Sequence, residues 1–209
     1  IVKDDVREKL GLSDDVVVST GGGDNMMSAI GTGTVKDGLM AMSLGTSGTL
    51  FAYSDRPIVD KRSRIASFAS STGGYLPLLC TMNCTVASEN MRKLFSLSVD
   101  EFSAKASSSQ IGSEGLVLLP YFNGERVPNY PNGEGVLAGM NMTNINEANI
   151  ARATLEGVSF GFLLGLEAFK EAGFKPTSLA LTGGGSNSAL WRQIIADSTS
   201  LEVKVPVLK

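Results

Sequence analysis

The stretch from Val16 to Ser47 reads VVVSTGGGDNMMSAIGTGTVKDGLMAMSLGTS, and it contains two apolar runs that end in glycine-rich turns. Val16–Val18 predicts a strand, because β-branched residues favour extended backbone, and it leads into Gly21–Gly23. Leu39–Leu44 predicts a second strand, which leads into Gly45–Gly48. Ligands of α/β sheets bind outside the carboxyl ends of strands, and glycine lets them approach the backbone closely. The stretch therefore predicts an α/β fold with a ligand site near these turns.

Apolar periodicity and turn residues extend this pattern over the rest of the chain. Further strands are expected at Thr49–Tyr53, Ile65–Ser71, Tyr75–Thr81, Leu116–Leu119, Leu179–Leu181 and Leu201–Val207. Helices are expected at Ile1–Leu10, Asn25–Ile30 (as a buried helix), Cys84–Phe95, Asp100–Ala106, Asn146–Gly173 and Ser188–Ser198. Residues 123–135 are rich in Gly, Pro and Asn, which predicts a long irregular loop. Hairpin strands followed by helices that alternate with strands are typical of the α/β class.

The composition is that of an ordinary globular protein, and it excludes several functional classes. The 209 residues are 43% hydrophobic and 19% charged, which is enough for the core of one large domain or two small ones. The formal net charge of −3 gives no electrostatic basis for binding nucleic acid. No apolar run approaches the roughly 20 residues that span a bilayer, so no membrane association is expected.

The chain has no histidine, and this narrows the chemistry. A Ser-His-Asp triad, a Cys-His dyad and the common His-ligated metal sites are excluded. A carboxylate, Lys, Tyr or Cys would have to transfer any proton. Two cysteines, Cys80 and Cys84, are too few for a disulfide framework or a zinc finger, and we expect reduced thiols in a cytoplasmic protein.

Asp24 directly follows the glycine triplet, and the residues alone allow two interpretations of it. An Asp at this position suits the N-terminal cap of the following helix. A lone carboxylate at a strand end also suits a general base, which takes a proton from a substrate hydroxyl. Asn25 beside it is either a hydrogen-bonding partner of that substrate or an ordinary residue of the first helical turn.

Two further glycine-rich segments are candidate phosphate or nucleotide sites. In Gly45–Gly48 the backbone N–H groups and two hydroxyls suit phosphate oxygens, although an ordinary hairpin turn fits the spacing equally well. Gly183–Ser188 joins a strand to a helix, but it has Ser188 where a dinucleotide-binding fingerprint has glycine. No Gly-Lys-Ser/Thr sequence occurs, so the chain is not a P-loop ATPase. Glu125 and Arg126, in the irregular loop, are expected to form a surface pair that orders it.

Five segments, in this order along the chain, resemble a known family. They are GGGDN at residues 21–25, SLGTSG at 43–48, LPYFNGERVP at 119–128, the segment from 135 to 156, and TGGGSN at 182–187. Together they resemble the second half of the FGGY-type carbohydrate kinases, and most closely the members that act on xylulose. The resemblance covers nearly all of the chain.

The resemblance implies a fold, a reaction and roles for individual residues. The expected fold is a ribonuclease-H/actin-like ATPase lobe, in which helices flank a mixed sheet, as one half of a two-lobe kinase. The expected reaction uses ATP and Mg²⁺ to phosphorylate a small sugar, D-xylulose, to D-xylulose 5-phosphate. Asp24 is then the general base, and it binds the sugar together with Asn25. Contacts to the phosphates or to ATP are implied for Gly45, Thr46, Gly184, Gly185, Asn187 and Ser188.

The resemblance also implies that residues 1–209 are the C-terminal nucleotide-binding lobe of a longer enzyme. The first residue is Ile1, and the Asp-x-Gly-Thr phosphate loop of the family's first lobe does not occur. We therefore expect a fragment that is inactive alone, with no metal ligands assigned in it. A homodimer of the full-length enzyme is compatible with the resemblance. The alternatives are a kinase for gluconate, ribulose or glycerol, and a non-catalytic actin-like lobe that binds a nucleotide or a protein.

Overall fold

Six strands form the main sheet of the computed structural model, which describes residues 2–19 and 21–206. Their order in space is β3-β4-β2-β1-β7-β8. These strands are β1 (Leu39–Leu44), β2 (Gly48–Ala52), β3 (Ala66–Ala69), β4 (Tyr75–Thr81), β7 (Ser178–Thr182) and β8 (Glu202–Lys204). β1 pairs antiparallel with β2 and parallel with β7, so the sheet is mixed, as predicted.

The helices begin and end close to the predicted positions. They are α1 (Asp4–Leu10), α2 (Asp24–Gly31), α3 (Thr85–Leu94), α4 (Val99–Ser108), α5 (Glu147–Glu171) and α6 (Ala189–Thr199), with short 3₁₀ turns η1 (Ser113–Gly115) and η2 (Gly184–Asn187). Asn146 caps α5, because its side chain accepts a hydrogen bond from Asn149 N at 2.9 Å. After α5, Gly173 has a φ of 86°, a left-handed conformation that ends the helix. The predicted cap and the predicted glycine stop are both confirmed.

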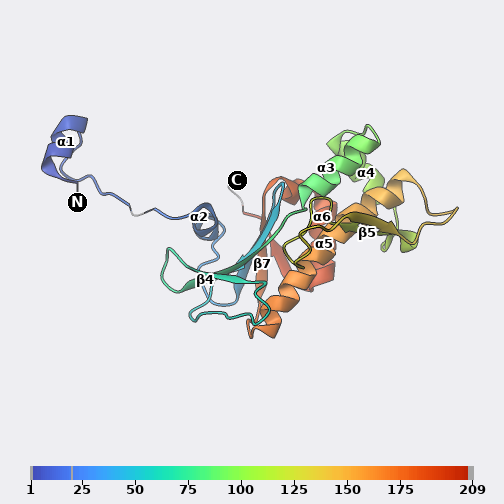
Figure 1. Cartoon of the computed structure of the whole chain (residues 1–209). Coiled ribbons are helices and arrows are strands. Elements are labelled where there is room, and N and C mark those ends of the chain that lie inside the picture. Colours follow the sequence, from blue (N-terminus) through green and yellow to red (C-terminus); the bar gives the residue numbers. More distant parts are fainter. Residues whose placement is uncertain (1, 20, 207–209) are drawn as a thin grey trace.

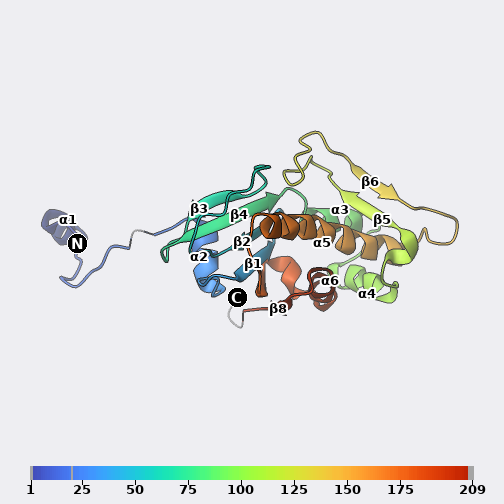
Figure 2. The same ribbon diagram turned by 90° about the horizontal axis from the view of Figure 1, so that it is seen from below.

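The two faces of the main sheet are covered by different helices. Along β1, Met40 and Met42 point to one side and Ala41 points to the other, as the pleat of a strand requires. The side of Met40 packs against α5 and α6 in the larger core, which includes Phe162, Leu166, Phe169, Trp191, Ile194 and Ile195. The side of Ala41 packs against α2 in a smaller core, made of Ala29, Ala41, Phe51, Leu76 and Leu78. Figure 1 and Figure 2 show α5 and α2 on opposite faces.

A second sheet of two strands lies beside α5, away from the main sheet (Figure 2). It consists of β5 (Val117–Pro120) and β6 (Gly135–Ala138), which pair antiparallel. Leu116 and Leu118 pack against Ala153 of α5. β6 was not expected from the sequence, because four residues that begin in a glycine-rich loop give too short a pattern. The segment between these strands, residues 121–134, contains only isolated bridges, so the predicted irregular loop is confirmed.

The beginning of the chain differs from the prediction. Residues 16–18 do not form a strand; Val17 is 87% exposed, and no strand of either sheet pairs with them. A strand needs a neighbour for its N–H and C=O groups, and the described part of the chain places none beside this segment. Figure 1 shows it as an extended connection between α1 and α2. The predicted burial of Asn25–Ile30 is also wrong, since Ala29 is the one buried residue of α2.

Two expectations from composition concern the cysteines and the membrane. Both cysteines are free thiols. Burial raises the pKa of the Cys84 thiol to about 12, so it stays protonated at neutral pH. Within residues 2–19 and 21–206, no helix combines the length and the hydropathy needed to cross a bilayer. The predictions made for Ile1 and Val207 fall outside the described residues.

Candidate functional site

Three strands of the main sheet end at the same edge, which is the edge formed by the ends of the strands and not by an outer strand. β1 and β7 are parallel, and β4 runs in the same direction because β1 and β4 are both antiparallel to β2. The segments that follow them, residues 45–47, 82–84 and 183–187, therefore lie at the same edge. The last of these contacts the end of β1, since a Cβ on Gly183 would lie 2.7 Å from the Leu44 carbonyl. The sheet thus brings the predicted phosphate turn and the predicted nucleotide turn together, at the edge where α/β sheets bind ligands.

The predicted phosphate turn, residues 45–47, is held by the start of α3. Thr85 N donates to Gly45 O at 2.9 Å, and Cys84 N donates to Thr46 O at 3.2 Å. These bonds use carbonyl oxygens of the turn. Its backbone N–H groups and the exposed hydroxyls of Thr46 and Ser47 are the groups that suit phosphate oxygens.

Gly48, the residue after this turn, packs against the hydrophobic core. A Cβ at this position would collide with the Phe162 ring of α5 and would lie 2.6 Å from Thr81 Oγ1. Only glycine therefore lets the turn sit directly on the side chain of Phe162, which is completely buried. The position of the turn depends on the packing of α5.

Asp24 lies at the start of α2, on the opposite face of the sheet. Gly23 is the N-terminal cap of α2 and Asp24 is its first helical residue, so the interpretation of Asp24 as a side-chain cap is wrong. The exposed carboxylate accepts a hydrogen bond from Asn25 N at 2.8 Å. Burial raises the pKa of the Cys80 thiol near the end of β4, and the charge of Asp24 raises that pKa further. Cys80 pairs with Thr49 of β2. The effect of Asp24 on Cys80 therefore places Asp24 close to the edge that carries the phosphate turn.

A cavity of about 440 Å³ opens beside the nucleotide turn. All four predicted residues of this turn line it: Gly184, Gly185, Asn187 and Ser188. Helices α3 and α4 supply further lining residues, among them Thr85, Ser88, Glu89, Arg92, Asp100 and Ser103. Pockets for small ligands and cofactors usually measure about 300–1,000 Å³. Thr85 lines the cavity and also donates to Gly45 O, so the cavity adjoins the phosphate turn.

Gly184 and Gly185 of the nucleotide turn have different surroundings. No atom lies within 4 Å of a Cβ built on Gly184, so a side chain there would project into open space. A Cβ on Gly185 would lie 2.8 Å from Leu44 Cβ and 2.9 Å from the Trp191 ring. Packing therefore explains Gly185, while Gly184 leaves room for a ligand to approach the backbone.

Ser188 and Asn187 follow these glycines and lead into α6. Ser188 caps α6, because its Oγ accepts a hydrogen bond from Trp191 N at 3.2 Å. Asn187 is exposed, and its carbonyl oxygen accepts from Arg192 Nη1 at 3.1 Å. Both residues line the cavity.

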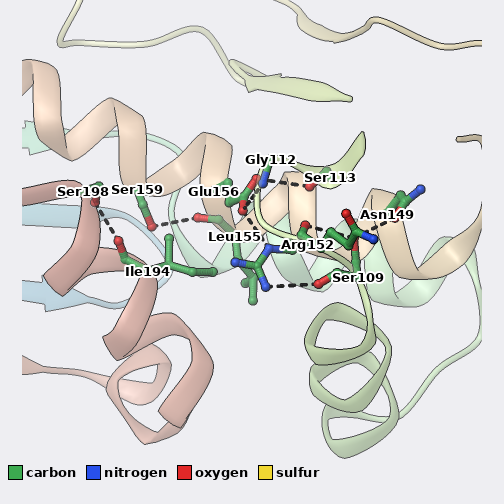
Figure 3. Close-up of polar contacts among 11 residues, drawn as sticks. Ser109, Gly112, Ser113, Asn149, Arg152, Leu155, Glu156, Ser159, Ile194 and Ser198 are labelled. Carbon is green, nitrogen blue, oxygen red and sulfur yellow. Dashed lines mark hydrogen bonds and ion pairs between the residues drawn. The ribbon is translucent and has the colours of Figure 1, made fainter. Parts of the chain in front are cut away.

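A buried polar network holds α4 and the segment after it against α5 (Figure 3). Arg152 and Glu156, one turn apart on α5, form an ion pair at 2.7 Å. Arg152 Nη1 donates to Ser109 O at 3.3 Å, and Glu156 accepts from Gly112 N and from Ser113 Oγ, each at 3.1 Å. Each buried charge thus has an opposite charge and neutral partners, which a charge in the interior requires. Because α4 lines the cavity, this network fixes part of its shape.

A second polar contact supports the cavity from α6. Trp191 Nε1 donates to Ser159 Oγ at 3.0 Å, and Ser159 Oγ donates in turn to Leu155 O at 2.8 Å. Trp191 and Leu155 both line the cavity. The tryptophan is therefore part of the buried core and also forms part of the cavity wall.

The expectation of a surface pair at Glu125 and Arg126 is wrong for the glutamate. Glu125 is only 4% exposed, and its carboxylate accepts hydrogen bonds from Met82 N and Asn83 Nδ2, next to the end of β4. Arg126 is exposed. No local pattern marks a glutamate in a Gly/Pro/Asn loop as buried, because its partners lie more than forty positions earlier in the sequence.

The sequence analysis also missed the cavity residues of α3 and α4. Glu89 and Arg92 pair at 2.6 Å, and the hydrogen bond from Arg92 lowers the pKa of Glu89 below its ordinary value. Their i,i+3 spacing is visible in the sequence, but that spacing equally suits a solvated helix face. Only the packing of α3 and α4 beside the nucleotide turn shows that they line a cavity.

The residues present suit a nucleotide better than a metal held by protein side chains. In the described ranges, 2–19 and 21–206, no three Asp, Glu, Cys or His side chains lie close enough to hold an ion. Mg²⁺ in kinases is usually bound through one or two carboxylates together with the phosphates of the substrate. A bound nucleotide would therefore bring much of the coordination of such an ion.

Comparison with known proteins agrees with this geometry. The model of the C-terminal domain of the FGGY family of carbohydrate kinases matches residues 40–207. A xylulose kinase of Haemophilus influenzae is 43% identical over 203 residues, which cover 97% of this chain and 41% of that protein.

Solved structures give the same result. The crystal structure of xylulose kinase from Bifidobacterium adolescentis is 35% identical with a TM-score of 0.86, over 95% of this chain and 40% of that one. Gluconate kinase from Lactobacillus acidophilus is 25% identical with a TM-score of 0.87, over 97% and 42%. The chain thus spans about two fifths of the length of these relatives. Its fold is the actin-like ATPase fold of FGGY sugar kinases, and the chain belongs to the FGGY family of carbohydrate kinases, within their C-terminal domain.

Proposed function

We propose that this chain is the C-terminal, nucleotide-binding lobe of an enzyme that transfers the γ-phosphoryl group of ATP to a hydroxyl of D-xylulose. The observation that carries the proposal is the convergence, at one region of the sheet, of a phosphate-type turn, an adjoining cavity and the exposed carboxylate of Asp24. The relatives that are named xylulose kinases support D-xylulose as the acceptor. In this arrangement adenosine occupies the cavity, and the phosphates reach the turn at residues 45–47.

Asp24 would act as the general base of the transfer. Its carboxylate takes the proton of the sugar hydroxyl as that oxygen forms a bond to the γ-phosphorus, and the bond from phosphorus to the oxygen of ADP breaks. A positioned base is typically worth about 10²–10⁴-fold in rate. Asn25, the next residue of α2, would hydrogen-bond a neighbouring hydroxyl of the sugar. Mg²⁺, when bound with ATP, would neutralise phosphate charge.

The rest of the longer enzyme would supply the opposite wall of the site and most contacts to the sugar. Phosphoryl transfer depends on positioning ATP, Mg²⁺ and the acceptor together. Residues 1–209 alone would therefore bind nucleotide weakly and would not turn over sugar. The proposal involves no nucleic acid, and it is compatible with a homodimer of the full-length enzyme.

The experiment is a coupled ADP-release assay on the full-length protein with ATP, Mg²⁺ and a panel of acceptors. We expect the highest kcat/KM with D-xylulose, and lower values with gluconate, ribulose and glycerol. A preference for gluconate would replace the proposed acceptor but keep the kinase. The absence of sugar-dependent ADP release with every acceptor would contradict the proposal, and turnover by residues 1–209 alone would contradict the division between lobes.

A further inference from the structure

Glu125 and Arg126 are adjacent charged residues in the loop at residues 121–134, and the proposed function uses neither. Glu125 is buried, and its carboxylate receives three N–H donors: Met82 N at 2.6 Å, Arg126 N at 2.8 Å and Asn83 Nδ2 at 3.1 Å. Asn83 Nδ2 also donates to Gly124 O at 2.8 Å. Hydrogen bonds to a charged acceptor are stronger than neutral ones. Glu125 therefore fastens the loop to residues 82 and 83, at the edge where β4 ends.

The same clamp holds the main chain at Arg126 in place, because Glu125 Oε1 accepts a hydrogen bond from the backbone N–H of Arg126 itself. The guanidinium reaches the Cys80 thiol: burial raises the pKa of that thiol, and the charge and hydrogen bond of Arg126 act in the opposite direction. On β4, Cys80 belongs to the side that packs against α2. Arg126 thus extends from the loop to the sheet face that carries Asp24.

Arg126 and Asp24 are opposite charges that both act on the Cys80 thiol. The Cys80 side chain is within reach of both charges. Yet among the ion pairs of the described residues, which include pairs for other arginines, neither Arg126 nor Asp24 takes part. A carboxylate and a guanidinium that both lie near Cys80 without an ion-pair partner leave both groups open to a ligand. The carboxylate suits a hydroxyl, and the guanidinium suits a planar or tetrahedral oxyanion.

We propose that Arg126 binds the phosphoryl group as it passes to the sugar, on the side of the acceptor, and that Glu125 is the positioning residue that holds Arg126 there. This inference rests on the proposed function. While Asp24 accepts the proton of the sugar hydroxyl and the bond from phosphorus to ADP breaks, Arg126 donates hydrogen bonds to oxygens of the transferred group. After transfer, the same guanidinium contacts the phosphate of the sugar phosphate product.

The test uses the full-length protein with Arg126→Gln, Arg126→Lys and Arg126→Ala. We expect Arg126→Gln to lower kcat by about 10²-fold, the scale for losing one donor to developing charge, and to leave the KM for ATP within about twofold. The inhibition constant of D-xylulose 5-phosphate, measured as a product inhibitor, should rise about tenfold. Arg126→Lys should retain part of kcat, and added guanidinium ion should restore part of the activity of Arg126→Ala.

Two further variants separate charge from structure. Glu125→Gln should lower kcat in the same assays, but less than Arg126→Gln does. It loosens the loop that carries the guanidinium without removing the guanidinium. Arg56→Gln, which removes an exposed arginine at the opposite edge of the sheet, is the matched control and should leave all constants unchanged.

Three results would overturn the inference. The first is an unchanged kcat in Arg126→Gln, with wild-type protein active on D-xylulose; this would leave the proposed function intact. The second is a lower kcat with unchanged product inhibition and no response to guanidinium, which would mean a purely structural role. The third is a wild-type protein without sugar-dependent ADP release, which would overturn the proposed function as well.

Discussion

The two faces of the main sheet differ in how they use the helices that cover them. On the α5 face, helix, strands and α6 share a continuous core, and α5 buries residues around most of its surface. On the α2 face, one short helix contributes a single buried residue, Ala29, while Met27 and Ile30 remain exposed. The cavity adjoins elements of the first face, and Asp24 stands on the second.

The two faces of the sheet therefore have different roles. The α5 face fixes the position of the backbone turns, so its side chains should matter mainly for stability. The α2 face presents an exposed carboxylate on a lightly packed helix, so its polar residues should matter mainly for turnover. If this division holds, substitutions on the two faces will affect different measurements.

The largest effect is expected from Phe162→Ala on the α5 face. Phe162 is fully buried and lies directly beneath Gly48, so its removal leaves a cavity under the phosphate turn. We expect a loss of about 3–5 kcal/mol in the free energy of unfolding, measured by urea denaturation. A loss below about 1 kcal/mol would show that the turn does not depend on this packing.

Asp24→Asn on the α2 face should act on turnover instead. The side chain is exposed and caps no helix, so we expect folding and ATP binding to be unchanged. In the full-length protein kcat should fall by about 10²-fold or more, the usual scale for a general base. Near-normal turnover of D-xylulose would contradict the assignment of Asp24.

Gly184→Val tests the cavity that adjoins the α5 face. Open space surrounds the position of the added side chain, so the protein should keep its stability. The valine would project into the cavity, and we expect ATP affinity to fall about tenfold, the equivalent of ~1.4 kcal/mol, while the KM for sugar changes less. Isothermal titration calorimetry with ATP measures this affinity. An unchanged affinity would place the adenosine elsewhere.

The smallest effect is expected from Ile30→Ala, the counterpart of Phe162→Ala on the other face. Ile30 is 46% exposed at the end of α2. Surface substitutions usually change stability by less than about 0.5 kcal/mol, and we expect this one to do so in the same urea assay. A loss as large as that of Phe162→Ala would show that the two faces are packed alike.

Elements with a strong local signal were predicted well from the sequence. Asn146 and Gly173 bound the long helix, and the hairpins at residues 39–53 and 65–81 are found close to their predicted places. Each has a cap, a glycine stop or a tight turn between apolar runs, which are signals within one element. Residues 16–18 show the limit of such signals, because three valines favour a strand only where another strand lies beside them.

The candidate site was predictable where a motif lies on a turn, and not where residues meet by packing. Gly184 and Asn187 lie three positions apart in sequence and line the same cavity, as the motif indicates. Asp100 and Ser103 line it too, but nothing near them in sequence distinguishes them from a solvated helix face. The burial of Glu125 depends on donors in residues 82 and 83, and such a long-range arrangement leaves no periodic trace.

The contact between Gly48 and Phe162 ties the phosphate turn to the hydrophobic core. Evolution therefore has little freedom to adjust the turn at this position independently, since a substitution that moves the turn also disturbs the packing on which cellular abundance depends. Thr46 and Ser47, which are exposed, carry no such double constraint. Variation that tunes phosphate affinity should accumulate at these two neighbours, while residues 48 and 162 change only together.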